Sequence, residues 1–433
     1  MNILTKIKKK LKLIVTESLI KASLTLNLPL LSAIAFKQII GKINFEKEYT
    51  VLCLGRSIFT DDVKALAEFS ENTNYLVLNL HYWYIIYDYC IPELERAKIS
   101  EDNYHSHSYG DEGKKKYYIF LSKLLPLLKK KIKFDAILAG NFGYVPQQEI
   151  ARLCQDKNIP YIVLHKEAFR AFSDPDHHKG LYDNFHFAGH KMLLYNNQIK
   201  DLLLSLNISG LTKEKCQVVG IPRLDYYFNL PPKDNKTKQV TFFSYYPQDK
   251  FEYLINDKQK QVQAIERSEM YHRDIIQFAI NYSDTKVIIK TKVSGYYVNY
   301  VKSILNKYFP NHNIPNLTIT NAGNTSDYII NSNAVVGFFT TTLVEALIAG
   351  KTIISLYFND LVTDKCWNYF SNYPDLVNYA SNYDQLKEFI TNYKKYVCQD
   401  EKRKKEFLEW LIASADGNAS KRVEKQIIEL INK

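Results

Sequence analysis

The stretch "NAVVGFFTTTLVEALIAGKTIISLYF", Asn333 to Phe358, contains the pattern that decides the fold. An apolar run of β-branched and aromatic residues ends at three threonines, and Leu343, Leu347 and Ile348 then follow at helical spacing. A glycine comes next, and a second apolar run follows it. This order predicts strand, turn, helix, turn and strand, which together make one βαβ unit.

Length and composition indicate a globular protein of two domains. A chain of 433 residues is too long for one ordinary core, and 46% hydrophobic with 24% charged residues is the composition of a folded protein. The net charge of +11 comes mostly from dispersed lysines, without the interleaved basic and aromatic residues of a nucleic-acid platform. We therefore expect no nucleic-acid partner.

Strand-like and helix-like stretches alternate along the chain in two rounds. Runs such as "YTVLCLG", "DAILAG" and "PYIVLH" occur in the first round, and "VTFFSYY", "KVIIKTK" and "TIISLY" occur in the second. The polar stretch "NLPPKDNKTKQ", residues 229–239, separates the two rounds and is the expected linker. The predicted class is α/β, with two doubly wound Rossmann-like domains facing a cleft, over residues 46–232 and 238–433.

Residues 1–45 predict a basic amphipathic helical segment. Apolar residues at helical spacing form one stripe, and lysines crowd the remaining surface. Two interpretations stay open: residues 1–20 lie on an anionic membrane surface, or the helix docks on the protein's own core with its lysines in water. The stripe comprises Ile3, Leu4, Ile7, Leu11, Ile14 and Val15, and the lysines are Lys6, Lys8, Lys9, Lys10 and Lys12.

The remaining composition argues against secretion, membrane spanning and zinc binding. The six cysteines are scattered without a CxxC pair, and no run reaches the ~20 apolar residues that cross a bilayer. The basic start continues through Glu17 and Lys21 without the clean apolar core of a signal peptide. We expect a cytoplasmic protein, which the membrane interpretation would place at the inner face of the cell membrane.

The three threonines form the first candidate site. Ligands of open α/β sheets bind beyond the carboxyl ends of the strands, and Thr340, Thr341 and Thr342 stand between a strand and its helix. Hydroxyls and free backbone N–H groups converge there, which suits a phosphate group. The alternative is structural, since Thr342 and Glu345 have the spacing of a capping box. The two interpretations can coexist.

Other strand ends carry charged or polar candidates. Lys290 and Lys292 are two positions apart, so a β-period places both ammonium groups on one face, where they either neutralise a diphosphate or are simply solvated. The segment "GIPRLDYY" follows another strand just before the expected linker, and a serine follows the first strand after the linker. We expect these positions to line the cleft: Gly220, Arg223, Asp225 and Ser244.

His165 and Glu167 are the candidate general bases. Both follow directly on the buried strand of "YIVLHKEAFRAF", and either side chain can accept a proton once its surroundings tune its pKa. A hydrogen-bonded structural role is the alternative for His165. The turn "DPDHHKG", residues 174–180, has acids and imidazoles but no third ligand within reach, so we predict no metal site.

Several of these motifs together resemble GT-B glycosyltransferases, in particular the bacterial capsule and surface polysaccharide proteins related to the CDP-glycerol glycerophosphotransferases. The stretch "VVGFFTTTLVEALIAGKTIISL" is similar to their last nucleotide-binding unit, and "CQVVGIPRLDYY" to the segment before their second domain. The stretch "ADGNASKRV", residues 415–423, resembles the start of their closing helix. The resemblance covers about residues 130–430.

The resemblance implies transfer of a sugar or polyol-phosphate unit from an activated nucleotide, with the nucleotide on the second domain and the acceptor on the first. It implies a catalytic His or acid on the first domain, and His165 is the matching position. No cofactor or metal is implied, because helix N-termini and lysines can offset the charge of the leaving diphosphate. The implied nucleotide and phosphate site contains Thr340, Thr341, Thr342, Glu345, Lys290 and Lys292.

Departures from the family pattern favour a sugar transferase over a glycerol-phosphate polymerase. "LHKEAF" lacks the HG pair of the relatives, and Thr352 stands where they usually have proline.

Two loops of the first domain are candidates for the acceptor side: "LGRSIFTDD", with Arg56, Asp61 and Asp62, and "LAGNFGYVPQQE". Arg56, Asp61 and Asp62 could equally cap a helix.

The leading hypothesis is therefore a glycosyltransferase that moves a sugar from a nucleotide sugar to a surface-polysaccharide or lipid-linked glycan acceptor. The alternatives are a nonhydrolysing UDP-sugar 2-epimerase of the same fold, a polyol-phosphate transferase, and a noncatalytic polysaccharide-assembly subunit that recruits partners at the membrane. Turnover of a nucleotide sugar without an acceptor would separate the epimerase from the transferase.

Overall fold

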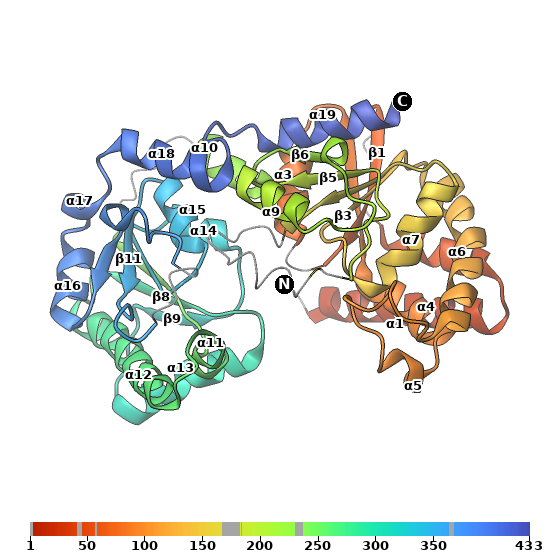
Figure 1. Cartoon of the computed structure of the whole chain (residues 1–433). Helices are drawn as coiled ribbons and strands as arrows, with labels where there is room; N and C mark the ends of the chain where they lie inside the picture. The colour runs from red at the N-terminus through yellow and green to blue at the C-terminus, as the bar shows by residue number, and fades with distance from the viewer. Residues whose placement is uncertain are drawn as a thin grey trace. The chain divides into compact units, whose positions relative to one another are not determined.

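The computed structural model describes residues 3–40, 46–56, 59–166, 182, 184–229, 237–362 and 368–433, without the side chains of residues 3–10 and 253. The chain divides into two compact units, drawn in Figure 1. The first unit comprises Met1–Phe169, Asp174–Asp225 and Trp410–Lys433, and the second comprises Arg170–Ser173 and Tyr226–Glu409. Each unit is described below by itself.

The first unit is built on a six-stranded sheet with the strand order β2-β1-β3-β4-β5-β6, and every pairing between these strands is parallel. Most strand residues are buried, which explains why the strands read as short, nearly continuous runs of Val, Ile and Leu. The strands are β1 (Tyr49–Gly55), β2 (Thr73–Asn79), β3 (Ala136–Ala139), β4 (Tyr161–Leu164), β5 (Lys191–Leu194) and β6 (Cys216–Val218).

Helices of the first unit include a cluster near the start of the chain. Phe36 is fully buried and its ring centroid lies 5.1 Å from that of Trp83, so α2 is anchored on α4. The expected segment over residues 1–45 is thus two helices, which pack on α4 and α6 as part of the first unit. These helices are α1 (Ile3–Thr25), α2 (Pro29–Ile39), α3 (Thr60–Phe69), α4 (Leu80–Cys90), α5 (Glu93–Arg96), α6 (Asp111–Ile132), α7 (Val145–Asp156), α9 (Asn197–Ser205) and α19 (Ala419–Ile431).

The second unit is built on another six-stranded parallel sheet, with the order β12-β11-β10-β7-β8-β9. Its core is a cluster of buried residues from these strands and from the helices that cover them, and Phe242, Phe251 and Phe278 are among its largest fully buried side chains. The strands are β7 (Gln239–Phe243), β8 (Lys286–Lys290), β9 (Leu317–Thr320), β10 (Ala334–Gly337), β11 (Thr352–Leu356) and β12 (Asn378–Ala380).

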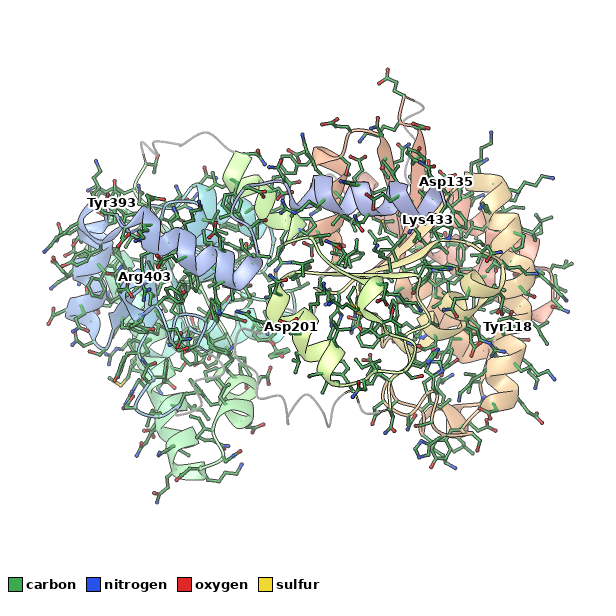
Figure 2. All side chains as sticks on the ribbon, turned by 45° about the horizontal axis from the view of Figure 1, so that its top comes forward. Tyr118, Asp135, Asp201, Tyr393, Arg403 and Lys433 are labelled. Atoms are coloured by element: carbon green, nitrogen blue, oxygen red, sulfur yellow. The ribbon has the colours of Figure 1, made fainter. Side chains whose placement is uncertain are left out.

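The helices of the second unit follow its strands in turn. On α18 (Glu401–Ile412), the guanidinium carbon of Arg403, labelled in Figure 2, lies 4.2 Å from the ring centroid of Tyr373. Arg403 also pairs with Asp375 at 3.2 Å, which holds this helix to the turn before β12. The helices are α11 (Pro247–Leu254), α12 (Lys258–Asn281), α13 (Gly295–Tyr308), α14 (Thr325–Ile330), α15 (Thr342–Ile348), α16 (Tyr383–Thr391) and α17 (Tyr393–Tyr396). Two further helices, α10 (Asp225–Asn229) and α18 (Glu401–Ile412), each include residues assigned to both units.

The closing helix α19 belongs to the first unit, whereas we expected the whole of residues 238–433 in the second domain. The Asp225 carboxylate accepts hydrogen bonds from the backbone N–H groups of Ala419 (3.0 Å) and Ser420 (2.7 Å), so it caps the start of α19. Further along, the Glu424 carboxylate accepts from the backbone N–H groups of Glu71 and Asn72. Figure 1 shows α19 beside α3, although the two come from opposite ends of the chain.

Gly220 lies against the same helix. Its φ of +84° falls in the left-handed region, and a Cβ there would lie 3.1 Å from Nη2 of Arg422 and 3.3 Å from Cβ of Ala419. Arg422 in turn donates to the carbonyl oxygen of Val219 at 2.8 Å. The segments "GIPRLDYY" and "ADGNASKRV" therefore bind each other.

The predicted α/β class with two doubly wound parallel sheets is confirmed. The unit boundary lies at Asp225 and Tyr226, a few residues before the expected linker, of which residues 230–236 are outside the described part of the chain. Among the described residues, no helix combines the length and the apolar character that crossing a bilayer requires.

We predict that Asp225→Ala lowers the free energy of unfolding of the first unit by about 1.5–3 kcal/mol, because it removes a charged acceptor from two buried backbone N–H groups. Urea denaturation followed by tryptophan fluorescence measures this, since Trp83 is buried in the first unit. Glu429→Ala, at an exposed position of the same helix, is the matched control and should change stability by less than about 0.5 kcal/mol. Equal midpoints for the two variants would contradict the capping role.

Candidate functional site

The second sheet has its topological switch point between β10 and β7. From β7 the chain proceeds outward through β8 and β9, and it then returns to the other side of β7 for β10. Parallel register pairs Phe243 with Gly337 and with Lys290, so β7, β10 and β8 end level with one another. Ligands of open α/β sheets bind at the carboxyl ends beside such a switch point, and the loops after these three strands are therefore the candidate site.

The threonine turn after β10 has an unusual backbone. Phe339 has a φ of +51°, a conformation that costs a non-glycine residue roughly 1–2 kcal/mol. The turn folds back so closely that a Cβ on Gly337 would lie 2.7 Å from the methyl carbon of Thr340. Within the turn, the Thr340 hydroxyl oxygen lies 3.0 Å from that of Thr342 and accepts from the Thr342 backbone N–H at 3.3 Å.

The capping box that we considered for Thr342 and Glu345 is not formed. The Glu345 carboxylate accepts a hydrogen bond from the Tyr227 hydroxyl at 2.8 Å, and Thr340 provides the side-chain contact at the helix start instead. Thr341, the residue before the helix, makes no capping bond through its side chain. Because α15 has only 7 residues, its dipole is small, and a phosphate here would depend on neighbouring cations.

Lys250 is such a cation, and the sequence did not identify it. It lies in α11, and its Nζ donates to the carbonyl oxygen of Phe339 at 2.9 Å while lying 4.4 Å from the Phe339 ring centroid. Burial, together with the nearby charge of Lys292, lowers the pKa of Lys250 to about 7. Lys250 therefore bridges the loops after β7 and β10, and an anion bound there would favour its charged form.

The two predicted lysines do not act as a pair. Lys290 is buried, and its Nζ donates to the carbonyl oxygens of Thr291 (2.8 Å) and Asn321 (3.2 Å), so it holds the ends of β8 and β9 together. Burial lowers the pKa of Lys290. Lys292 is exposed, with its Nζ 5.7 Å from the ring centroid of Tyr297. Of these two lysines, Lys292 is the surface cation near Lys250.

Ser244, directly after β7, belongs to the same edge of the sheet. Its Oγ lies 2.8 Å from Nε2 of His272, while Nδ1 of His272 lies 2.7 Å from the carbonyl oxygen of Ser268. A carbonyl only accepts, so Nδ1 carries the proton and Nε2 accepts from the Ser244 hydroxyl. Burial lowers the pKa of His272 to about 4, which keeps this tautomer neutral. Toward a ligand Ser244 thus presents acceptor lone pairs, which suit a hydroxyl or N–H group rather than a phosphate.

Three of the expected cleft residues have structural contacts in the first unit. Arg223 donates through Nη1 to both oxygens of the fully buried Asp62 (3.2 and 3.1 Å), and the Tyr195 hydroxyl donates to the same carboxylate at 2.8 Å. Asp225 caps α19, and Gly220 packs against α19. Asp62 is therefore occupied in the core, whereas Asp61 is an exposed partner of Lys64.

His165 directly follows β4 at the carboxyl edge of the first sheet, as predicted. Its side chain is buried, with the residue only 1% exposed, and its ring packs edge-on against Phe142 with centroids 5.2 Å apart. The backbone N–H of His165 donates to Leu193, and that of Lys166 to Gly140, so this segment connects β5 to the loop after β3. Glu167 and residues 174–180 lie outside the described residues.

The switch point of the first sheet lies between β1 and β3 and carries Arg56 and Tyr144. The guanidinium carbon of Arg56 is 4.8 Å from the Tyr144 ring centroid, and a hydrogen bond with Tyr144 raises the pKa of Arg56. Arg56 is exposed, which leaves this cation accessible at the edge where we expected the acceptor. Tyr144 was inside the quoted loop but was not singled out, because strand order was unknown from sequence.

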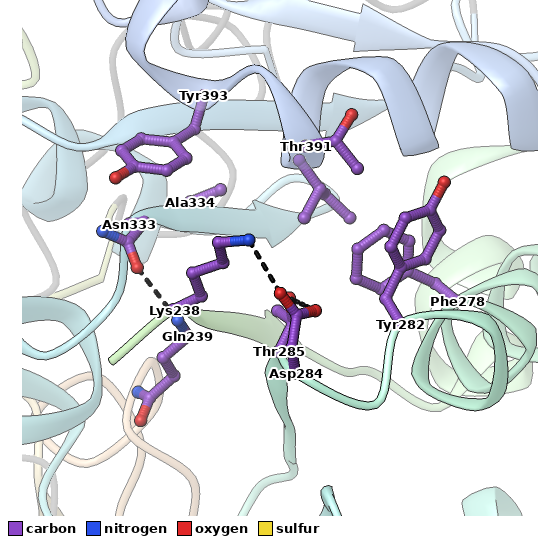
Figure 3. Close-up of a pocket in the computed structure, with 11 residues that line it drawn as sticks. Lys238, Gln239, Phe278, Tyr282, Asp284, Thr285, Asn333, Ala334, Thr391 and Tyr393 are labelled. Atoms are coloured by element: carbon purple, nitrogen blue, oxygen red, sulfur yellow. Dashed lines mark hydrogen bonds and ion pairs between the residues drawn. The ribbon is translucent and has the colours of Figure 1, made fainter. Parts of the chain in front are cut away.

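A separate cavity of about 290 Å³ lies at the amino ends of the second sheet, shown in Figure 3. Lys238 and Asp284 pair across it at 2.7 Å, and Gln239 and Ala334 begin β7 and β10 beside it. It is at the opposite edge of the sheet from Lys250 and the threonines, so we assign it no part in the candidate site. In the described ranges, no group of three His, Cys, Asp or Glu side chains could hold a metal ion.

Comparison with known proteins extends the fold assignment. No protein-family model matches the sequence, and no curated protein matches it either. A UDP-N-acetylglucosamine 2-epimerase structure aligns with a TM-score of 0.51 at 12% identity, over 89% of this chain and 97% of that chain. A Listeria monocytogenes protein described as a candidate UDP-N-acetylglucosamine 2-epimerase aligns with a TM-score of 0.51 at 11% identity, over 88% of this chain and 96% of that chain.

A third structure, described as trehalose-6-phosphate from E. coli bound with UDP-2-fluoro glucose, has a TM-score of 0.46 at 10% identity, over 89% of this chain and 99% of that chain. At such low sequence identity, the two alignments with a TM-score above 0.5 show a similar fold and nothing more. The chain has the GT-B-like α/β fold that its motifs predicted.

We predict that affinity for a nucleoside diphosphate sugar falls as the pH rises above about 7. Lys250, with its pKa lowered to about 7, is then neutral in the free protein, whereas a bound diphosphate favours the charged form. Binding must therefore take up a proton, and affinity decreases by up to about tenfold per pH unit. Calorimetry of wild type and Lys250→Met measures this affinity. The control is Lys286→Met, because Lys286 begins β8, at the end of the strand away from the candidate site. A Lys250→Met variant that keeps the wild-type pH profile would exclude Lys250 from the site.

Thr341→Val together with Thr342→Val should weaken binding of the same nucleotide sugar by roughly 1–3 kcal/mol, because two hydroxyl donors to a charged phosphate are lost without a change in side-chain shape. Thr391→Val, at the amino edge of the same sheet, is the matched control. Unchanged affinity of the double variant for every nucleotide that the wild type binds would remove these threonines from the site.

Proposed function

We propose that this protein is a glycosyltransferase that moves a sugar from a nucleotide sugar to a hydroxyl group of a surface-polysaccharide or lipid-linked glycan acceptor. The observation that carries the proposal is the convergence of a low-pKa lysine and a threonine turn at the switch point of the second sheet. Three sequence motifs resembling those of the capsule-related GT-B group support it.

In this proposal the second unit holds the nucleotide sugar. Lys250 and Lys292 neutralise the diphosphate, and the hydroxyls of Thr341 and Thr342 donate to it. As the glycosidic bond breaks, the negative charge that develops on the leaving diphosphate is stabilised by these groups already in place. Ser244, held as an acceptor by His272, binds a sugar or ribose hydroxyl or a nucleobase N–H.

The first unit then binds the acceptor. Arg56, exposed at the switch point of the first sheet and stacked on Tyr144, suits the phosphate of a lipid-linked acceptor. His165, at the end of the neighbouring β4, is the proposed base that takes the proton from the attacking hydroxyl. Glu167 remains the alternative base.

Epimerisation at C2 of a UDP-sugar is the second candidate, because the two structures with a TM-score of 0.51 are described as UDP-N-acetylglucosamine 2-epimerases. Incubation with a panel of nucleotide sugars, with and without lipid-linked acceptor, separates the candidates. Release of nucleoside diphosphate only with acceptor supports transfer. A changed sugar without acceptor supports epimerisation, and no turnover under either condition supports the noncatalytic subunit.

We predict that His165→Ala lowers turnover by about 10²–10⁴-fold, the usual contribution of a general base, while nucleotide affinity stays nearly unchanged because the nucleotide binds the other unit. Since His165 is buried, His165→Gln provides a second variant that preserves most of the packing, and thermal unfolding checks both. Normal turnover in both variants, with loss in Glu167→Gln, would assign the base to Glu167. Normal turnover in all three would make this segment structural.

A further inference from the structure

The helix α1 contacts the first unit through a small and partly polar face. Its buried described residues recur at spacings of three and four, and the helix packs on α2 and α4. Two hydroxyls on this face bond within the local backbone, that of Thr16 to the carbonyl oxygen of Lys12 and that of Ser23 to Leu28. The inward face comprises Thr16, Ile20, Ser23 and Leu24.

The apolar stripe of α1 lies on the other side. Leu11, Ile14 and Val15 are 56%, 52% and 51% exposed. Ile14 and Ser23 are nine residues apart, which at about 100° per residue places them about 180° apart on the helix. The stripe therefore points away from the unit's core, and Leu26, just beyond the helix end, is also exposed.

This orientation bears on both interpretations of the segment, over its described side chains. The helix does dock on the protein's own core, but it does so through Thr16, Ile20, Ser23 and Leu24, which leaves the stripe uncovered. A second group of exposed apolar residues, Leu26, Leu28 and Leu30, lies around the turn between α1 and α2. Exposed apolar residues gathered on one element in this way are typical of an interaction site.

Charge identifies the kind of surface that would cover the stripe. The sequence of α1 contains six lysines and one glutamate, and the carboxylate of that glutamate, Glu17, lies 3.1 Å from Nε2 of His81. Lys12 and Lys21 are exposed beside the stripe. Two copies of such a helix would repel each other, whereas an anionic bilayer complements both the charge and the apolar stripe.

We propose that α1 is a docking surface for an anionic lipid bilayer and lies in the plane of the interface. Leu11, Ile14 and Val15 enter the boundary between headgroups and acyl chains, and Lys12 and Lys21 contact lipid phosphates. The docking is measured with vesicles and without turnover, so its test does not depend on the reaction proposed above.

Sedimentation of the whole chain with vesicles tests the proposal. Vesicles of phosphatidylcholine with phosphatidylglycerol should bind the protein at least about tenfold more tightly than phosphatidylcholine alone, and rising salt should weaken the binding. The double variant Ile14→Glu, Val15→Glu should lose about tenfold or more, since it places carboxylates in the stripe. Lys12→Glu with Lys21→Glu changes only exposed charges and should also weaken binding.

The matched control is Val262→Glu with Met270→Glu on α12, where the same chemical change is made at apolar residues 55% and 50% exposed in the second unit. This variant should bind as wild type does, and thermal unfolding should be alike for all variants. No wild-type binding to anionic vesicles, or undiminished binding by both α1 variants, would overturn the proposal. So would a loss of self-association in the Ile14→Glu, Val15→Glu variant, measured by light scattering, without any change in vesicle binding.

Discussion

Parallel pairing within each sheet is the constraint on which the candidate sites depend. Because the interior strands are buried on both faces, a strand cannot shift in register without moving apolar side chains out of the core. Phe243 is thus held level with Gly337 and Lys290, and the loops that follow begin side by side. Lys250 can bond the carbonyl oxygen of Phe339, 89 residues away in sequence, only because the strand order brings β7 next to β10. That bond and the stacking of Phe339 on Tyr369 help to offset the strained φ of Phe339.

Local patterns predicted the elements well, and non-local pairing explains what they missed. The opening stretch folds as expected, into β10, α15 and β11, because continuous apolar runs, a threonine turn and a glycine each act within a few residues. Strand order is set by contacts between distant segments, so neither Lys250 nor the pairing of Arg56 with Tyr144 could be found by pattern. The burial of Lys290 was missed for a related reason, since its partner Asn321 follows the next strand. The short β12 lacks a continuous apolar run.

The motifs that carry the family resemblance divide into two physical classes. Arg223, Asp225 and Arg422 bind carboxylates, backbone N–H groups or carbonyl oxygens inside the first unit, so they stabilise its fold. Thr341 makes no capping bond through its side chain and lies beside the switch point of the second sheet, the kind of place where ligands of open α/β sheets bind. A motif shared with enzymes therefore identifies a fold as readily as a reaction, and only the contacts of each residue separate the two.

The attachment of α19 to Asp225 also has a consequence for biosynthesis. Their hydrogen bonds join residues 194 and 195 positions apart, and the whole of Tyr226–Glu409 lies between them. On the ribosome the second unit is complete before the last helix of the first unit has been made. Since domains fold largely as they emerge, the nascent first unit must wait with Asp225 lacking these two partners and with the surface of α3 that α19 later covers still exposed, and such intermediates are prone to aggregate.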